Sequence, residues 1–412
     1  MQLDEILEGR HDAAHVVDAD LFGKAFRFVQ ADQARALGLY PYFQPLENND
    51  GPVARFQGRD VIMLGSNNYL GLTAHPKVRE AAADAARRYG PSCTGSRLLN
   101  GSFEMHERLE ARLAEFVGLE AALVFATGYQ TNVGILSALV GPKDTAVLDE
   151  HDHASLQDGA RVARGQMVRF KHNDLDDLGR VLGAIDGPGG KLVAVDGLYS
   201  MEGDLADLPG IVRAARAAQA RILVDDAHGL GTLGPGGRGT AAHFGLTAEV
   251  DLIMGTFSKS FASVGGFAAG PARVIDFMRH FARPMLFSAS LPPPNVAAVD
   301  AALTVMLAEP ERVTRLAENA AYWRQGLREW GFDIGNTTSA IVPVVIGGEP
   351  QTLMIWKALA EAGVYVNAVL YPAVPLSRAM LRTSVIATHE RAQLDRALEA
   401  MVKLARQFGV IN

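Results

Sequence analysis

The chain has 412 residues, of which 48% are hydrophobic and 21% charged, an ordinary composition for a soluble protein with a large core. Its length indicates more than one domain, and a formal net charge of −7 argues against nucleic acid or an anionic membrane as a partner. The single cysteine, Cys93, excludes an intrachain disulfide and fits the reducing cytoplasm.

The N-terminal region, residues 1–62, is expected to form an arm that ends in the strand-like Val61 to Leu64. Met1 to Arg10 carry three acidic residues and lack the apolar centre of a secretory signal. The segment from Asp20 to Leu39 mixes Phe, Leu, Lys and Arg, and we interpret it as a helix packed on a partner subunit. Peripheral association with a membrane is the alternative for this segment, since no apolar run is long enough to span a bilayer.

Residues 63–294 are expected to form a large domain of alternating strands and helices. Apolar runs predict strands at Ala121–Phe125, Thr145–Asp149, Lys191–Val195, Arg221–Asp225, Asp251–Gly255 and Gly266–Ala269. Helical patterns cover Thr131–Leu139 and Leu208–Ala220. Continuous Val/Ile/Leu strands between helices predict an α/β fold with a mostly parallel sheet, in which ligands bind beyond the carboxyl ends of the strands.

Residues 295–412 are expected to form a smaller α+β domain after the break at Pro292-Pro-Pro294. The expected elements, in chain order, are a long helical stretch Val296–Trp330 that contains Pro310, a strand Ala340–Ile346, a helix Thr352–Ala362, a loop Asn367–Ser377, a strand Met380–Ile386 and a helix His389–Phe408.

Two strand ends in the large domain carry the most informative side chains. The strand that ends at Asp225 continues into Asp-Ala-His228, and a later strand is followed by Thr256-Phe-Ser-Lys259. Pyridoxal phosphate chemistry needs these groups: a lysine for the Schiff base, a carboxylate that keeps the pyridine nitrogen protonated, and hydroxyls that hold the phosphate. Asp225 is preferred over its neighbour Asp226, because only one of two adjacent residues on an extended chain points into the site.

The phosphate has a second set of candidates in Thr127-Gly128-Tyr129, where a strand turns into a helix. Backbone N–H groups at a helix N-terminus attract anions, although an ordinary strand-to-helix turn would look the same. Thr256 and Ser258 are the hydroxyl candidates.

Further candidates each have a structural alternative. His153 follows a strand and would cover the pyridine ring, or else it is a helix cap. His228 would contact the phenolic oxygen, and Ser200 is either a ring contact or a solvated loop serine. Arg382 sits in an apolar strand, where it would bind an amino-acid carboxylate or form a structural ion pair. No metal site is predicted.

From about Leu39 to its end, the chain resembles the α-oxoamine synthases, a branch of the fold-type I pyridoxal phosphate enzymes. The motifs that carry the resemblance are Ser66-Asn-Asn-Tyr-Leu-Gly-Leu72, Gly95-Ser-Arg-Leu-Leu-Asn-Gly101, Gly128-Tyr129, His153-Ala-Ser155, Asp225-Asp-Ala-His-Gly229, Gly255-Thr-Phe-Ser-Lys259 and Leu381-Arg-Thr-Ser384. Such enzymes condense a small amino acid with an acyl thioester and release carbon dioxide. They are homodimers that share the active site between subunits.

The resemblance also implies a role for each matched residue. Lys259 would be the Schiff-base lysine, Asp225 the partner of the pyridine nitrogen, and His153 the stacking ring. His228 and Ser200 would contact the cofactor ring. Arg382 and Asn67 would bind the amino-acid carboxylate.

Within the family, Phe257-Ser-Lys-Ser-Phe-Ala-Ser-Val-Gly-Gly266 and Gly38-Leu-Tyr-Pro-Tyr-Phe43 are most similar to the serine palmitoyltransferases. That similarity implies L-serine and a long-chain acyl thioester such as palmitoyl-CoA as substrates, with 3-ketosphinganine as product. Some members have an arginine before the proline-rich loop, where this chain has Leu370 and Tyr371, so carboxylate binding rests on Arg382 alone or with help from Arg378. The alternatives are glycine or alanine as the amino acid, a carrier-protein thioester as the acyl donor, an aminotransferase of the same fold, and a non-catalytic subunit.

Overall fold

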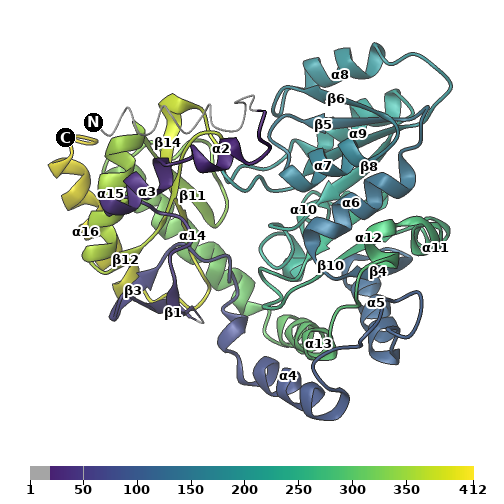
Figure 1. Ribbon diagram of the computed structural model, residues 1–412, viewed down its shortest axis with the longest axis horizontal. Coiled ribbons are helices and arrows are strands. Elements are labelled where there is room, and N and C mark those ends of the chain that lie inside the picture. The colour runs from purple at the N-terminus through teal and green to yellow at the C-terminus, as the bar shows by residue number, and fades with distance from the viewer. Residues whose placement is uncertain (1–18, 50) are drawn as a thin grey trace. The chain divides into compact units, whose positions relative to one another are not determined.

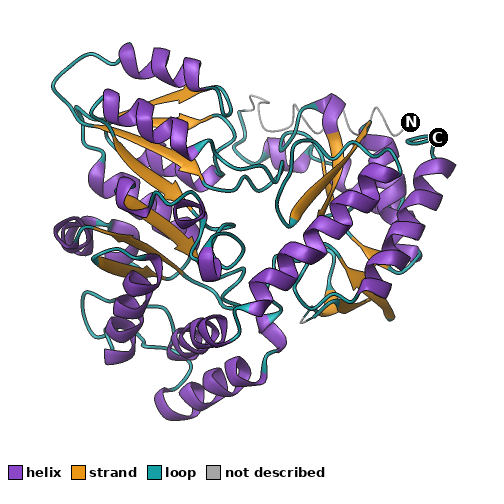
Figure 2. Ribbon diagram, turned by 180° about the vertical axis from the view of Figure 1, so that it is seen from behind, coloured by secondary structure: helices purple, strands orange, loops and turns teal. Residues whose placement is uncertain are grey.

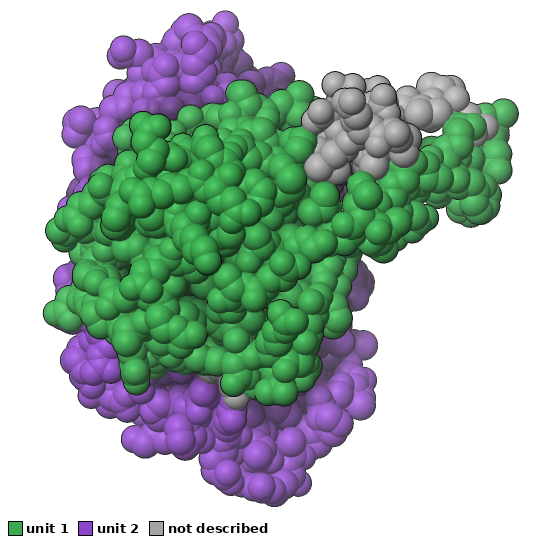
Figure 3. Space-filling view, turned by 90° about the vertical axis from the view of Figure 1, so that its left-hand side faces the viewer, with its two compact units in different colours: residues 1–66, 318–412 green, residues 67–317 purple. Residues whose placement is uncertain are grey.

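The computed structural model describes residues 19–49 and 51–412, so the interpretation of Met1 to Arg10 concerns residues outside the described part. Contacts within the chain divide it into two compact units (Figure 3). One unit is residues 67–317, and the other joins residues 1–66 to residues 318–412. The division into an arm, a large domain and a small domain at residues 62 and 294 stays a prediction.

The unit of residues 67–317 is built on a seven-stranded sheet with the order β4-β10-β9-β8-β7-β5-β6. Its strands are β4 (Ala121–Phe125), β5 (Thr145–Asp149), β6 (Gln166–Phe170), β7 (Lys191–Asp196), β8 (Arg221–Asp225), β9 (Leu252–Thr256) and β10 (Gly266–Gly270). The pairs between β6 and β9 are all parallel, and only β10 runs antiparallel to both of its neighbours, β4 and β9. The predicted α/β class with a mostly parallel sheet is therefore confirmed.

Helices lie on both sides of this sheet (Figures 1 and 2), with α6 packed on α7 and α8 packed on α9. The helices of this unit are α4 (Pro76–Tyr89), α5 (Glu104–Val117), α6 (Gly128–Leu139), α7 (Ala154–Val162), α8 (Leu175–Gly183), α9 (Leu208–Ala217), α10 (Thr240–His243), α11 (Ala272–Phe281), α12 (Arg283–Leu286) and α13 (Pro293–Ala308), with short 3-10 turns η1 (Leu72–Ala74), η2 (Pro235–Gly237) and η3 (Thr247–Glu249). Helix α14 (Glu311–Glu329) begins in this unit.

The sequence explains why the strands are buried and where the helices begin. All five residues of β5, Thr145 to Asp149, are buried, because a parallel sheet that is covered on both faces has no solvent side. Side chains cap the helices that follow the strands: Thr127 accepts a hydrogen bond at the start of α6, and Asp174 and Asp207 do so at α8 and α9. These caps place the helix N-termini beside the carboxyl ends of the strands.

The unit of residues 1–66 and 318–412 contains two smaller sheets. A four-stranded sheet has the order β1 (Leu46–Asn48), β2 (Val53–Phe56), β3 (Arg59–Met63) and β12 (Val364–Tyr365). A three-stranded antiparallel sheet has the order β11 (Ile341–Gly347), β14 (Ala379–Ser384) and β13 (Asn367–Val369). The helices are α2 (Gly23–Phe26), α3 (Gln30–Ala36), α15 (Glu349–Glu361) and α16 (Arg391–Gln407), with η4 (Leu376–Arg378) and most of α14.

Three expectations about elements were wrong or incomplete. The stretch Val296–Trp330 is not one helix, because Pro310 lacks an N–H and separates α13 from α14. The expected loop Asn367–Ser377 begins with β13, which is only three residues long and therefore lacks a clear periodic signal. Strand β6 was missed because Gln166 and Arg169 interrupt its apolar residues, as suits the edge of the sheet.

Candidate active site

A cavity of about 300 Å³ lies in the unit of residues 67–317, at the carboxyl ends of β8 and β9. Parallel strands present the residues that follow them along one edge of the sheet, which is where ligands bind in such folds. The residues that line the cavity are Thr127, Gly128, Tyr129, His153, Ser155, Asp196, Leu198, Asp225, Ala227, His228, Met254, Thr256, Ser258, Lys259, Val264 and Gly265.

Lys259 and Asp225 enter this cavity from adjacent strands. Asp225 is the last residue of β8, and its backbone pairs with Met254 of the parallel strand β9. Asp225 is buried, and its Oδ1 accepts a hydrogen bond from the Ala227 N–H at 3.0 Å. Lys259 follows β9 by three residues and also lines the cavity.

The neighbouring Asp226 points elsewhere. Its carboxylate accepts hydrogen bonds from the Thr240 backbone N–H at 2.7 Å and from the Thr240 hydroxyl at 2.6 Å. Burial raises the pKa of Asp226 to about 7, although the hydrogen bonds from Thr240 favour its charged form. The structure thus gives the two adjacent carboxyl groups separate surroundings, and Asp225 is the one in the cavity.

His153 is both a helix cap and a residue of the cavity lining. Its Nδ1 accepts a hydrogen bond from the Ser155 backbone N–H at 3.2 Å at the start of α7. Burial lowers the pKa of His153, while the charge of Asp225 opposes this shift and that of Lys259 adds to it. The ring is therefore neutral at physiological pH.

His228 lies three residues beyond Asp225 and is buried. Its Nδ1 is 2.7 Å from the hydroxyl of Tyr69, which also donates a hydrogen bond to the Oδ1 of Asn67 at 3.3 Å. Asn67 is thereby linked to the histidine, although it does not line this cavity.

Thr127, Gly128, Thr256 and Ser258 form the polar end of the cavity. The hydroxyls of Thr256 and Ser258 are 2.9 Å apart. Gly128 is the first residue of α6, and a Cβ there would lie 2.6 Å from the Oγ1 of Thr256, so this close approach requires glycine. Tyr129 lines the cavity, but its hydroxyl donates a hydrogen bond to Asp158.

The remaining predicted residues lie outside the cavity lining. Ser200 is half-buried in the turn after β7. Arg382 is buried in β14, where its Nη1 donates to the Ser384 hydroxyl at 3.1 Å, and Arg378 is exposed at the end of η4. Both arginines belong to the other unit.

Sequence reasoning missed three residues of the site. Asp196 ends β7 in register with Asp225, and burial together with the charge of Asp225 raises its pKa well above the usual range. An acidic residue at the end of a third parallel strand was the available signal, but the predicted strand stopped at Val195. Ser155 lines the cavity from α7, and the fully buried Asn132 of α6 donates a hydrogen bond to the Oδ2 of Asp225 at 2.6 Å.

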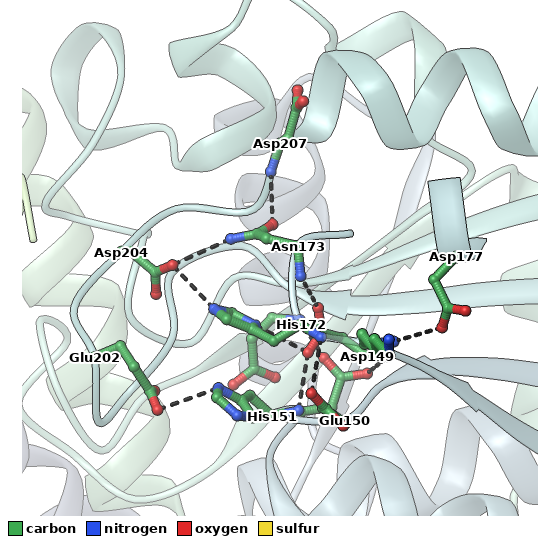
Figure 4. A network of polar contacts seen from close by, with 12 residues as sticks. Asp149, Glu150, His151, His172, Asn173, Asp177, Glu202, Asp204 and Asp207 are labelled. Atoms are coloured by element: carbon green, nitrogen blue, oxygen red, sulfur yellow. Dashed lines mark hydrogen bonds and ion pairs between the residues drawn. The ribbon is translucent and has the colours of Figure 1, made fainter. Parts of the chain in front are cut away.

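A second polar cluster lies at the carboxyl ends of β5 and β6 (Figure 4). His172 is placed between two carboxylates: its Nδ1 is 3.0 Å from Asp149, and its Nε2 is 3.0 Å from Asp204. The ring of His151 stacks on that of His172 with 4.2 Å between centroids, and its Nδ1 is 3.1 Å from Glu202. Within residues 19–49 and 51–412, no group of His, Cys, Asp and Glu is arranged to hold a metal ion.

Burial would lower the pKa of His172, but the hydrogen bonds to Asp149 and Asp204 prevail and raise it to about 10. The same contact with His172 lowers the pKa of Asp149, although its burial acts in the opposite direction. His172 thus forms an ion pair with each of two carboxylates, and these contacts attach the loop that contains Asp204 to the ends of β5 and β6.

Known proteins resemble this chain over nearly all of its length. Residues 59–401 match the family Aminotransferase class I and II. A serine palmitoyltransferase of Sphingobacterium spiritivorum is 46% identical over 379 residues, which cover 92% of this chain and 95% of that protein. An 8-amino-7-oxononanoate synthase of Symbiobacterium thermophilum is 42% identical over 375 residues, covering 91% and 96% of the two chains.

A solved structure agrees with these sequence matches. It is a serine palmitoyltransferase with pyridoxal phosphate as an internal aldimine, and it superimposes with a TM-score of 0.92 and 38% identity. The superposition covers 95% of this chain and 100% of that one, so the fold is that of the fold-type I enzymes.

Proposed function

The chain belongs to the class I and II aminotransferase family, in its α-oxoamine synthase branch, and on this premise we propose that it condenses L-serine with a long-chain acyl-CoA. The proposed products are 3-ketosphinganine, coenzyme A and carbon dioxide. The observation that carries the proposal is the convergence of Lys259, Asp225 and His153 on one cavity at the carboxyl ends of neighbouring strands.

The groups of the cavity fit pyridoxal phosphate. The backbone at Gly128, together with the hydroxyls of Thr256 and Ser258, offers the hydrogen-bond donors that a phosphate needs, at the N-terminus of a twelve-residue helix. Lys259 offers the amine that bonds to the cofactor aldehyde, and Asp225 offers a carboxylate for the pyridine nitrogen. The glycine at position 128 leaves room for this close approach.

When bound, pyridoxal phosphate supplies an electron sink for the negative charge that develops at the Cα of the amino acid. Asp225 would hold a proton on the pyridine nitrogen, and the N–H of Ala227 keeps this carboxylate in place. Lys259, the residue that would hold the cofactor covalently, would also act as the base at the Cα of serine. His153 would cover the ring, and His228, held by Tyr69, would face the phenolic oxygen.

Arg382 and Asn67 are proposed to bind the serine carboxylate, with Arg378 as an assisting residue. Support for Arg382 comes from its place in the matched motif Leu381-Arg-Thr-Ser384, and its planar guanidinium suits a carboxylate in two-point contact. Ser200 is proposed as a further contact of the cofactor ring.

We also propose a homodimer with a shared active site, located in the cytoplasm, with peripheral membrane association as the alternative to a freely diffusing enzyme. The family resemblance supports the dimer, and large apolar side chains such as Leu21, Phe22 and Phe26 are exposed on the arm. None of the described helices has the length and apolar character needed to cross a membrane. Sedimentation of the purified protein tests the homodimer. Sedimentation in the presence of lipid vesicles tests the membrane association.

Competition between amino acids tests the proposed substrate. The purified protein is incubated with equal concentrations of serine, alanine and glycine plus palmitoyl-CoA, and the products are separated by mass. We expect the serine product to exceed each of the others by at least about tenfold, because a site that hydrogen-bonds a hydroxyl rejects substrates without one. Dominance of the alanine or glycine product would contradict serine as the substrate, whereas the assignment of the chain to its family would still hold.

The second candidate is an α-oxoamine synthase that uses glycine or alanine, and the 42% identity to an 8-amino-7-oxononanoate synthase favours it over an aminotransferase. The same competition distinguishes it by product mass. Formation of a keto acid without release of carbon dioxide would instead indicate an aminotransferase.

A further inference from the structure

A chain of hydrogen bonds inside the protein links Asp225 to His153. The Nδ2 of Asn132 donates to the Oδ2 of Asp225 at 2.6 Å and to the Oγ of Ser155 at 2.8 Å. The Oγ of Ser155 is 2.7 Å from the Nδ1 of His153. Asn132 and Ser155 are almost completely buried, with 0% and 1% exposure, so water does not compete for these contacts.

The geometry fixes the direction of each hydrogen bond. An amide nitrogen carries two hydrogens, and Asn132 Nδ2 has one acceptor for each. Turning the amide over would place its oxygen against the Asp225 carboxylate, which has no hydrogen to share, so the orientation is set. The Ser155 backbone N–H already donates to the Nδ1 of His153, which makes that nitrogen an acceptor. The Ser155 hydroxyl therefore donates to Nδ1, and the ring proton of His153 is on Nε2.

This arrangement is costly for Asn132 in one respect. Its Oδ1 is buried and has no hydrogen-bond partner among the described residues. An unsatisfied buried acceptor is a rare feature that calls for an explanation beyond packing. An apolar side chain of similar shape would avoid it but would leave Asp225 and Ser155 without their donor.

We propose that Asn132 and Ser155 are positioning residues, which hold the Asp225 carboxylate in one orientation and anchor the ring of His153 through the Ser155 hydroxyl. The proposal rests on the proposed function, in which Asp225 faces the pyridine nitrogen and His153 covers the ring. Asn132 and Ala227 together give Asp225 one hydrogen bond on each carboxylate oxygen, which fixes the plane of the carboxylate. The Asn132 side chain thus positions both groups that would contact the cofactor ring, Asp225 directly and His153 through Ser155.

A purely structural role is the competing explanation, because Asn132 lies on α6 and Ser155 on α7, which pack together. The two explanations differ in what the variants change. A structural link would lower the melting temperature and leave kcat and the retention of cofactor unaffected. A positioning role would lower both kcat and the cofactor retention.

The test uses Asn132→Leu and Ser155→Ala in the full-length protein. Ser137→Ala is the matched control, because Ser137 is a half-buried residue of the same helix and lies outside the site. Dialysis of the loaded protein measures cofactor retention, and steady-state kinetics separate kcat from KM.

We expect the wild type and Ser137→Ala to retain the cofactor on dialysis, and both test variants to lose it more readily. In Asn132→Leu, kcat and cofactor affinity should each fall about 10- to 100-fold, the effect of removing a hydrogen bond to a charged group, with the KM for serine changed less than about threefold. Ser155→Ala removes only one oxygen, so it gives the answer if Asn132→Leu does not fold.

Unchanged cofactor retention together with an unchanged kcat in Ser155→Ala and Asn132→Leu would overturn the proposal. Failure of the proposed function looks different. In that case the wild type makes no serine-derived product, although it retains cofactor and the two variants lose it, and the positioning role stands without the serine chemistry.

Discussion

Two imidazoles at the ends of neighbouring strands have opposite character in this protein. His153 follows β5, lies in the cavity, and has a pKa lowered by burial. His172 follows β6, lies between Asp149 and Asp204, and has a pKa of about 10. The difference arises because each nitrogen of His172 faces a carboxylate, whereas the Nδ1 of His153 accepts hydrogen bonds and stays without a proton.

The comparison teaches that the charge of an imidazole follows its partners more than its depth. One polar cluster, around His153 and Asp225, leaves groups available to a ligand. The other, around His172, uses its charges to hold a loop to the sheet (Figure 4). We therefore expect changes in the first cluster to affect catalysis and changes in the second to affect stability.

Asp225→Asn should give a large effect on the cavity side of the comparison. A neutral amide cannot hold the proton on the pyridine nitrogen, so kcat should fall by about 10²- to 10³-fold while thermal stability stays close to that of the wild type. Steady-state rates and a thermal melt measure the two quantities. Asp226→Asn is the matched control, and a larger loss of kcat in that variant would mean that the wrong aspartate has been assigned.

Arg382→Ala should act on one substrate only. Loss of a charge-assisted pair costs roughly 1.5–3 kcal/mol, which corresponds to an increase of about 10- to 100-fold in the KM for serine. The KM for palmitoyl-CoA should change much less, and Arg382→Lys should recover part of the loss. Equal increases in both constants would indicate a structural role for this buried guanidinium.

His172→Asn should show the reverse pattern, with stability lost and catalysis kept. Removing one partner from a buried ion pair costs about 3 kcal/mol, because Asp149 and Asp204 are left without a cation between them. The melting temperature should fall, and kcat should stay within about threefold of the wild type. The exposed His280 provides the control His280→Asn, for which no change in melting temperature is expected.

The pH dependence of stability should sharpen the same comparison. The folded protein raises the pKa of His172 from 6.5 to about 10, so the folded state holds a proton that the unfolded chain releases. The resulting stabilisation is complete below about pH 6.5 and is lost as the pH rises through about 10. Melting curves across this range should show the wild type approaching His172→Asn at high pH, and a constant difference between them would contradict the assigned charge.

Much of the site was predictable because residues that follow parallel strands meet at one sheet edge. Lys259, Asp225, His153 and His228 follow strands whose apolar runs are plain in the sequence, and all four line one cavity. Asn132 could not be predicted in this way, since its role depends on how α6 and α7 pack. Arg382 shows another limit, because a strand position gives burial but does not reveal which group the guanidinium binds.

Reductive labelling of the loaded protein tests the central assignment most directly. Borohydride converts the bond between the cofactor and its lysine into a stable amine, and mass analysis of peptides then identifies the labelled residue. We predict a single pyridoxyl phosphate on Lys259, and no label in Lys259→Ala, whose turnover should fall by more than about a thousandfold. A label on another lysine, or an undiminished rate in Lys259→Ala, would contradict the assignment of this cavity as the active site.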